Sequence, residues 1–354
     1  PLPFGLAWSL SAASAGDHLV IPLATVGAAL GPFDAWVGRQ RLHYGVGRSG
    51  GVTTGSGWHG APHLHRAAGA VTGFGIATRE PFHFPSFLRV LGPDRIEIAI
   101  GRTERAGDVE APWVVMGRLI GTPFSRRFTL GLNRGAIFGG TDRPVTLRRL
   151  IGVLIGEYGT DADGARSAFE NQVLSGVIRY RPPVERVLPL ELLLEFGADD
   201  MAGAIKEAPG IVAGFDVAAV PGLSHVSVTM EHTRFSAGSE GNLRAWYRNS
   251  DFGGSWSDDG RLFGHPLGGH GEETLVRVGF NAPERSTLVA VTGFTRQRRT
   301  YNLYAPEREG TSHGGSLAVE ADGRAGWGLR VWASYEGGAD WRTHQLHSAV
   351  SYRF

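Results

Sequence analysis

One stretch of this chain places aromatic and arginine side chains close together, a combination that suits carbohydrate binding. Residues 244–270 read RAWYRNSDFGGSWSDDGRLFGHPLGGH. Sugar rings present C–H faces that stack on tryptophan and tyrosine, and their hydroxyl or uronate groups suit arginine, asparagine and aspartate. The same residue types also fit an aromatic girdle at a membrane interface followed by a polar loop. Composition alone leaves both interpretations of this stretch open.

Other kinds of chemistry find little support in the sequence. The thirteen histidines include the pair His63 and His65, but no carboxylate cluster lies near that pair, so we expect no metal site. The absence of cysteine excludes thiol catalysis, disulfides and thiolate metal centres. The sequence also lacks an H-E-x-x-H motif and a P-loop. We therefore expect neither an enzyme nor a cofactor.

The elements that would position these residues follow from the hydrophobic period. In residues 341–354 the apolar residues Leu346, Val350, Tyr352 and Phe354 share one face of a strand. Seven further runs alternate in the same way, at 328–335, 275–281, 225–231, 211–217, 190–197, 127–133 and 95–100. Their apolar faces carry no charge, whereas the opposite faces carry five arginines and five carboxylates. A salt-bridged barrel lumen accommodates such a face, and a soluble core does not.

The connections between these strands indicate a transmembrane barrel. Outer-membrane barrels have short periplasmic turns and longer extracellular loops. Short turns are expected near 321–325, 281–284, 220–223 and 181–186, and longer loops near 299–313, 236–271, 198–209 and 140–167. The sequence begins with proline rather than methionine, which a removed signal peptide or a truncated sequence would explain. We predict an integral protein of the bacterial outer membrane.

The strand count is less direct. Weaker alternation at 3–14, 17–29, 34–44, 67–78, 168–181, 285–298 and 312–320 brings the expected strands to fifteen. Single-chain bacterial barrels have an even number of strands, so at least one is missing, and we place it between residues 45 and 124. The prediction is an all-β, antiparallel transmembrane barrel of 16–18 strands, with eighteen favoured, forming one domain over residues 1–354.

Two segments have helical rather than strand-like spacing. In residues 144–158, four apolar side chains recur at i, i+3, i+4 and i+7. Residues 112–120 offer a shorter pattern of Trp113, Met116 and Ile120. Each predicted helix either enters the lumen or lies on a loop.

Motifs at two places in the chain resemble the Wzi capsule-assembly family. The later match runs through Tyr247-Arg248-Asn249, Gly253-Gly254 and the segment GRLFGHPLG at 260–268. The earlier match runs from Gly38-Arg39 to YGVGRSGG at 44–51, where Tyr44 and Val46 stand in place of the family's tryptophan and proline. The resemblance implies an eighteen-stranded outer-membrane barrel that acts as a lectin and anchors capsular or other surface polysaccharide.

The resemblance also implies roles for particular residues. Trp246, Tyr247 and Trp256 would stack on sugars, Arg248, Arg261 and His265 would bind hydroxyl or carboxylate groups, and Arg148 and Arg149 would attract an acidic polymer. The expected partners are surface polysaccharide, outer-membrane lipid and lipopolysaccharide, with other envelope proteins as further candidates and no nucleic acid. The alternative functions are a porin-type channel for small neutral solutes and a structural barrel subunit of an envelope assembly.

Overall fold

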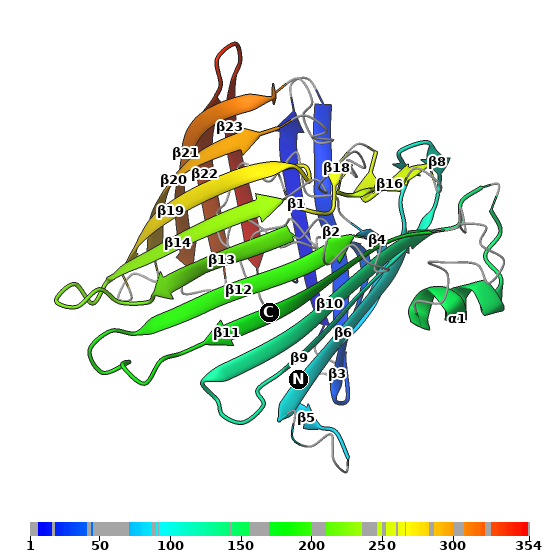
Figure 1. The fold of residues 1–354 in the computed structure, drawn as a ribbon, viewed down its shortest axis with the longest axis horizontal. Helices are drawn as coiled ribbons and strands as arrows, with labels where there is room; N and C mark the ends of the chain where they lie inside the picture. The colour runs from blue at the N-terminus through cyan, green and yellow to red at the C-terminus, as the bar shows by residue number, and fades with distance from the viewer. Residues whose placement is uncertain are drawn as a thin grey trace, which may run out of the picture.

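In this computed structural model of the protein, the structure is described for residues 6–15, 18–40, 44, 71–85, 90, 92–141, 143–155, 170–199, 210–235, 246–249, 253–259, 261–265, 267–282, 287–299, 308–322 and 327–352. These residues form one large antiparallel sheet that closes on itself as a barrel (Figure 1). Each long strand pairs with the next one along the chain, and the last strand lies beside the first. The topology is therefore a simple up-and-down meander.

The barrel wall has sixteen long strands. The sheet contains seventeen, one of which, β5, has only two residues (17 − 1 = 16). The predicted range of 16–18 is confirmed, and the favoured count of eighteen is not reached among the residues that the structure describes. The strands are β1 (Leu6–Ala15), β2 (His18–Leu30), β3 (Phe33–Gln40), β4 (Val71–Thr78), β5 (Phe82–His83), β6 (Pro93–Arg102), β9 (Trp113–Gly121), β10 (Phe128–Phe138), β11 (Glu170–Tyr180), β12 (Leu190–Asp199), β13 (Gly210–Val217), β14 (Val226–Phe235), β19 (Gly271–Ala282), β20 (Thr287–Arg298), β21 (Gly310–Asp322), β22 (Trp327–Gly337) and β23 (Arg342–Tyr352).

The connections fall into two classes that define the two ends of the barrel. At one end of the barrel four pairs of strands are joined by the long segments 41–70, 139–169, 200–209 and 236–270, and at the other end most strands are joined by the shorter segments 122–127, 181–189, 218–225, 283–286 and 323–326. Because outer-membrane barrels keep their long loops outside the cell, the first end is the extracellular one. All fifteen predicted strands are present, and the short turns fall where the sequence placed them.

The missing sixteenth strand is β9, which lies between residues 45 and 124 as predicted, but the helix predicted within this range was wrong. Residues 112–120, expected to be a helix, instead form a strand that pairs with β6 on one side and β10 on the other. Val114, Val115 and Met116 are all buried, because the lumen is filled on one face and a helix covers the other. A strand buried on both faces loses the alternation of apolar and polar residues by which strands are recognised.

The one predicted helix that is present lies outside the barrel. Helix α1 (Leu147–Ile155) packs Val153 and the partly buried Leu150 against Val115, Ala136 and Phe138 of β9 and β10. These wall residues belong to the outward face, since their neighbours Val114 and Ile137 contribute to the core inside the lumen. Figure 1 shows α1 beside the barrel wall at the extracellular end. The lumenal position considered from the sequence is therefore excluded for these residues.

The outward face of the strands is a continuous apolar band. Its exposed side chains include Val37, Phe74, Leu132, Val291 and Leu346, with exposed fractions between 49% and 73%. Burying such a band in lipid is favourable, whereas exposing it to water is not. No helix among the described residues is long and apolar enough to cross a membrane.

A row of polar side chains marks the extracellular edge of this band. His232, Thr274, Thr295 and His313 lie opposite one another on the four neighbouring strands β14, β19, β20 and β21. His232 Nδ1 is 3.1 Å from Thr274 Oγ1, and Thr295 Oγ1 is 3.1 Å from His313 Nδ1. The outward face becomes polar at this row, which places the row at the boundary between acyl chains and headgroups.

Candidate functional site

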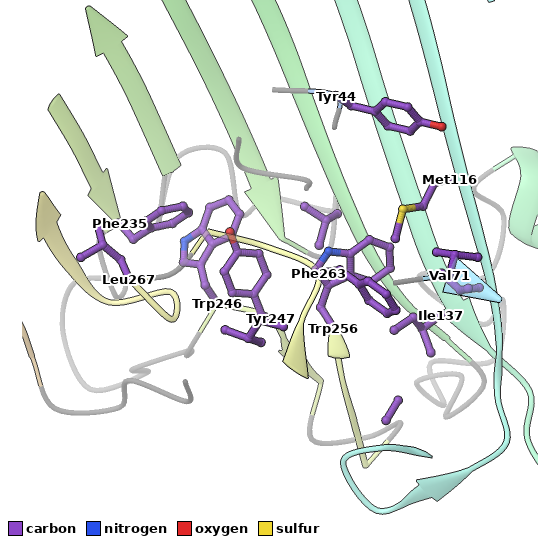
Figure 2. Close-up of a cluster of buried hydrophobic side chains, with 14 of the residues drawn as sticks. Tyr44, Val71, Met116, Ile137, Phe235, Trp246, Tyr247, Trp256, Phe263 and Leu267 are labelled. Carbon is purple, nitrogen blue, oxygen red and sulfur yellow. The ribbon is translucent and has the colours of Figure 1, made fainter. Parts of the chain in front are cut away.

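The connection between β14 and β19 folds into the extracellular half of the lumen. We call its described part, within residues 246–270, the plug loop. It contains two short hairpins, formed by β15 (Arg248–Asn249) with β16 (Gly254–Ser255) and by β17 (Ser257–Asp258) with β18 (Arg261–Leu262). Trp246, Tyr247, Trp256, Leu262, Phe263 and Leu267 of the plug loop are all at most 3% exposed. They belong to one buried cluster with Met116, Ile137 and Phe235 of the wall, and Figure 2 shows all of them except Leu262 labelled there.

Hydrogen bonds within the plug loop centre on Tyr247. Its carbonyl accepts from Trp256 N at 2.7 Å, and its phenol oxygen accepts from His265 N at 3.0 Å. Its own N–H donates to Asp199 Oδ2, at the end of β12, at 2.5 Å. Tyr247 has a φ of 70°, a left-handed conformation that non-glycine residues adopt only when the surroundings hold it. Burial raises the pKa of the Tyr247 phenol well above its usual value, so this hydroxyl stays neutral.

Two glycines allow the rings to lie directly against the backbone. A Cβ atom added at Gly135 of β10 would lie 2.3 Å from the Trp256 ring. A Cβ atom added at Gly264 would lie 2.2 Å from the Tyr247 ring. Both distances are shorter than carbon atoms tolerate, so any larger residue would displace these rings. Part of the high glycine content therefore permits close packing inside the lumen.

A third hairpin, outside the plug loop, contacts it from the side of the barrel formed by β6 and β9. It is formed by β7 (Arg105–Ala106) and β8 (Val109–Glu110), in the connection between β6 and β9. Asp258 Oδ1 accepts from Glu104 N at 2.8 Å, and its Oδ2 lies 3.3 Å from a guanidinium nitrogen of Arg39. Asp259 N donates to Arg105 O at 2.7 Å. The plug loop is thereby attached to both sides of the barrel.

Charged side chains on four neighbouring strands form a buried ionic cluster in the lumen wall. Arg296 pairs with Glu273 and, at 2.9 Å, with Glu336, while Arg298 lies 2.8 Å from the other Glu336 oxygen. Ser312 Oγ donates to that same oxygen at 2.8 Å. All five side chains are at most 8% exposed. Buried charges of this kind are tolerated because each is paired.

His265 of the plug loop lies against this cluster. Its ring is fully buried, with Nε2 3.8 Å from Glu273 Oε1 and Nδ1 accepting from Leu267 N at 3.2 Å. Burial is the main cause that lowers the pKa of His265 from 6.5 to about 4; Glu273 opposes this effect, and Arg296 and Arg298 add to it. At neutral pH the ring is uncharged, with its proton on Nε2.

The structure corrects the roles predicted for four of the site residues. Trp246, Tyr247, Trp256 and His265 are 0–1% exposed, so none presents a face on which a sugar could stack or to which it could hydrogen-bond. Their rings are instead packed together inside the lumen, where burying large aromatic surfaces is favourable. The sequence prediction assigned these four residues to a surface, whereas in the structure they belong to a core.

The four predicted arginines have different positions. Arg148 and Arg149 are exposed on α1. Arg248 and Arg261 lie in β15 and β18 of the plug loop, and their side chains fall outside the described part of the structure. His63 and His65 also lie outside it, and the residues that are described contain no group of three or more His, Asp or Glu side chains that could hold a metal ion.

Sequence reasoning missed the ionic cluster and the β7–β8 hairpin. Glu273 stands on the inward face of β19, just outside the run 275–281, and Arg296 and Arg298 stand on the inward face of β20, at the end of the weaker run 285–298. Extending each run to the extracellular end at period two would have placed these charges in the lumen. No comparable signal marks the hairpin, because its strands have only two residues each.

The comparison with protein families decides the identity of this barrel. The family described as "Capsule assembly protein Wzi" matches residues 24–345, most of the chain. The chain belongs to the Wzi capsule-assembly family. It is accordingly an outer-membrane β-barrel, as its apolar band and connection lengths indicate.

A solved structure agrees with this fold. The Escherichia coli protein Wzi, described as an outer-membrane, carbohydrate-binding β-barrel involved in group 1 capsule assembly, superposes with a TM-score of 0.69 at 16% identity, over 97% of this chain and 72% of that one. OpdL of Pseudomonas aeruginosa, with a TM-score of 0.49 at 8% identity over 99% and 87% of the two chains, is more distant. A search of curated protein sequences found no match.

Proposed function

We propose that this Wzi-family barrel binds and anchors surface polysaccharide at its extracellular face, as a lectin and not as an open channel. The observation that carries the proposal is the plug loop, whose aromatic side chains are buried inside the barrel against residues of the wall. A barrel closed by this loop would offer the outside a fixed surface of loops. The family match and the carbohydrate binding described for the E. coli protein support the same function.

In this proposal the buried rings have an indirect role. Trp246, Tyr247 and Trp256 hold the loop in position, and the polymer contacts come from side chains at the extracellular rim. Arg148 and Arg149, exposed on α1, remain candidates for an acidic polymer, because guanidinium groups bind carboxylates in bidentate fashion. The predicted roles of Arg248 and Arg261 are likewise retained as part of the proposal.

The direct test is binding of purified, detergent-solubilised protein to a glycan array that includes acidic capsular polymers. We expect binding that weakens in the double variant R148A/R149A. The matched control is R126A/R127A, which removes an adjacent pair of exposed arginines from the periplasmic turn before β10. Equal loss in both double variants would mean that only net charge matters, and the assignment to α1 would then be wrong.

Two further measurements separate this function from its alternatives. In a planar bilayer, a plugged lectin should conduct almost no current, whereas a porin for neutral solutes should show stable open channels. Deleting the gene should release polysaccharide from the cell surface. Unchanged retention together with no array signal would refute the proposal, and co-purifying envelope proteins without glycan binding would favour a structural subunit.

A further inference from the structure

Helix α1 covers the outward face of the barrel at its extracellular end. Its Val153 side chain and the partly buried Leu150 side chain contact Val115, Ala136 and Phe138, all of which point away from the lumen. The same outward face of β10 is exposed and apolar lower down, at Leu132. The helix therefore extends the lipid-facing wall of the barrel upward and takes no part in closing the lumen.

A charged side chain of the wall fixes the helix in this position. Arg134 of β10 also points outward, and one of its guanidinium nitrogens lies 2.5 Å from the Val153 carbonyl oxygen and 2.5 Å from Gln172 Oε1. Val153 belongs to the last turn of α1, where carbonyl groups lack partners within the helix and a cation is favourable. The contact gives the wall arginine a partner away from lipid and anchors the C-terminal end of the helix.

The level of α1 matches the headgroup boundary around the rest of the barrel. On β10 and β11 the outward face changes from apolar at Leu132 and Ile178 to polar at Arg134 and Gln172. On β14 and β19 the same change occurs at the row that begins with His232. Helix α1 lies directly above this change, where amphipathic helices bind membrane surfaces.

The face of α1 that points away from the barrel is partly apolar and partly cationic. Leu147 is 73% exposed and Ile151, its i+4 neighbour, is 48% exposed; Arg148, also exposed, lies beside Ile151 as its i−3 neighbour. We propose that α1 is an interfacial helix: Leu147 and Ile151 enter the acyl region of the outer leaflet, and Arg148 binds a phosphate group of a lipid there. Two observations favour lipid as the occupant, namely the continuity with the apolar band of the wall and the complementary charge of a lipid phosphate.

The depth of the helix can be measured cleanly because the chain has no cysteine. Single variants L147C and I151C carry a nitroxide label, and the protein is reconstituted in vesicles of phosphatidylcholine and lipid A. We expect both labels to be accessible to oxygen and protected from a water-soluble nickel complex, as a label in L346C on the lipid-facing side of β23 should be. A label in D340C, on the exposed β22–β23 turn, gives the reference for a position in water, which the nickel complex reaches readily. Labels on α1 that behave like that of D340C would overturn the proposal.

The phosphate contact is tested by neutralising Arg148. One basic residue at an anionic membrane surface contributes about fivefold to binding, so R148A should retain about fivefold less lipid A, measured by mass spectrometry of the purified protein. The control R105A removes another exposed arginine, which lies in the β7–β8 hairpin, and should retain lipid A as the unmodified chain does. Unchanged lipid retention in R148A overturns the contact; if acidic polysaccharide binding falls instead, Arg148 is a polymer contact. Gel mobility before and after heating confirms that each variant is a folded barrel.

Discussion

Acidification should release the plug loop from the lumen wall through His265. At neutral pH, Nδ1 of this ring accepts the Leu267 N–H at 3.2 Å, and Nε2 carries the proton toward Glu273. A second proton on Nδ1 removes that acceptor and adds a positive charge close to Arg296 and Arg298. Glu273 compensates for this charge only in part, because burial in the packed lumen disfavours the charged ring most.

The size and sign of the effect follow from two pKa values. Docked, His265 has a pKa of about 4, and in a released, solvated loop it has the ordinary value of 6.5. Between these values the released loop binds more protons than the docked one, so docking is strongest above pH 6.5 and weakens as the pH falls toward 4. At about 1.4 kcal/mol per pH unit, the full change in docking free energy is about 3 kcal/mol, or a few hundredfold in the docking equilibrium.

The assay is single-channel conductance in a planar bilayer, recorded between pH 7.5 and pH 4.5, since release of the loop opens the lumen. The open fraction should rise by up to about tenfold per pH unit below 6.5. The variant H265Q cannot take up a proton in this range and should show a much flatter response. The control H225Q changes a histidine in the turn before β14, at the opposite end of the barrel, and should follow the unmodified chain.

The comparison with H265Q is needed because other groups face the loop. Asp199 accepts from Tyr247, Asp258 accepts from Glu104, and both carboxylates take up protons when the solution is acidic enough. An equal pH response in H265Q and the unmodified chain would assign the effect to these carboxylates. A lumen that stays closed down to pH 4.5 would show that protonating His265 does not undock the loop. Each result refutes the reasoning.

Three further changes test how the lumen is held together. W256A removes a fully buried ring, should weaken plug-loop docking by about 3–5 kcal/mol and should raise bilayer conductance, whereas W327A on the outward face should not. G135V should displace the Trp256 ring and raise conductance, while G117V, where an added Cβ meets only one atom at 3.8 Å, should leave conductance unchanged. E336Q weakens the buried ion pairs that Glu336 forms with Arg296 and Arg298, so the free energy of unfolding should decrease by about 3 kcal/mol. The unfolding temperature, measured by the change of gel mobility on heating, should therefore fall. An unchanged unfolding temperature would contradict the stabilising role given to the ionic cluster.

Much of the fold could be predicted because a barrel wall has two different environments. Residues such as Val276 and Val278 face lipid while Arg277 faces the lumen, so the sequence must alternate, and the period is visible without a structure. The prediction failed at β9, where the plug side and α1 bury Val114 and Val115 on opposite faces. Apolar and polar residues alternate along a strand only where its two faces meet different environments, and the alternation disappears where both faces are buried against apolar groups.

The site was predicted less well for a related reason. Aromatic residues beside glycine and arginine have the same composition in a sugar-binding surface and in a loop that packs into a lumen. What distinguishes the two is the environment of each ring, such as the approach of Trp256 to Gly135 on a strand more than one hundred residues away in the chain. Sequence spacing contains no information about that contact, so the residues could be named but not placed.

The packing of the plug loop explains why its motif can resemble the family's without fixing the ligand. The segment that carries the resemblance includes Tyr247, Gly264, His265 and Leu267, which are packed inside the lumen. Gly264 makes room for the Tyr247 ring, and the Tyr247 phenol oxygen accepts the His265 N–H. These contacts depend on the lumen and not on the polymer outside it. Residues that contact polysaccharide are free to change with the polymer as long as the plug loop stays docked. Ligand specificity should therefore reside in side chains at the extracellular rim, while changes to the buried residues of the motif should alter conductance and stability first.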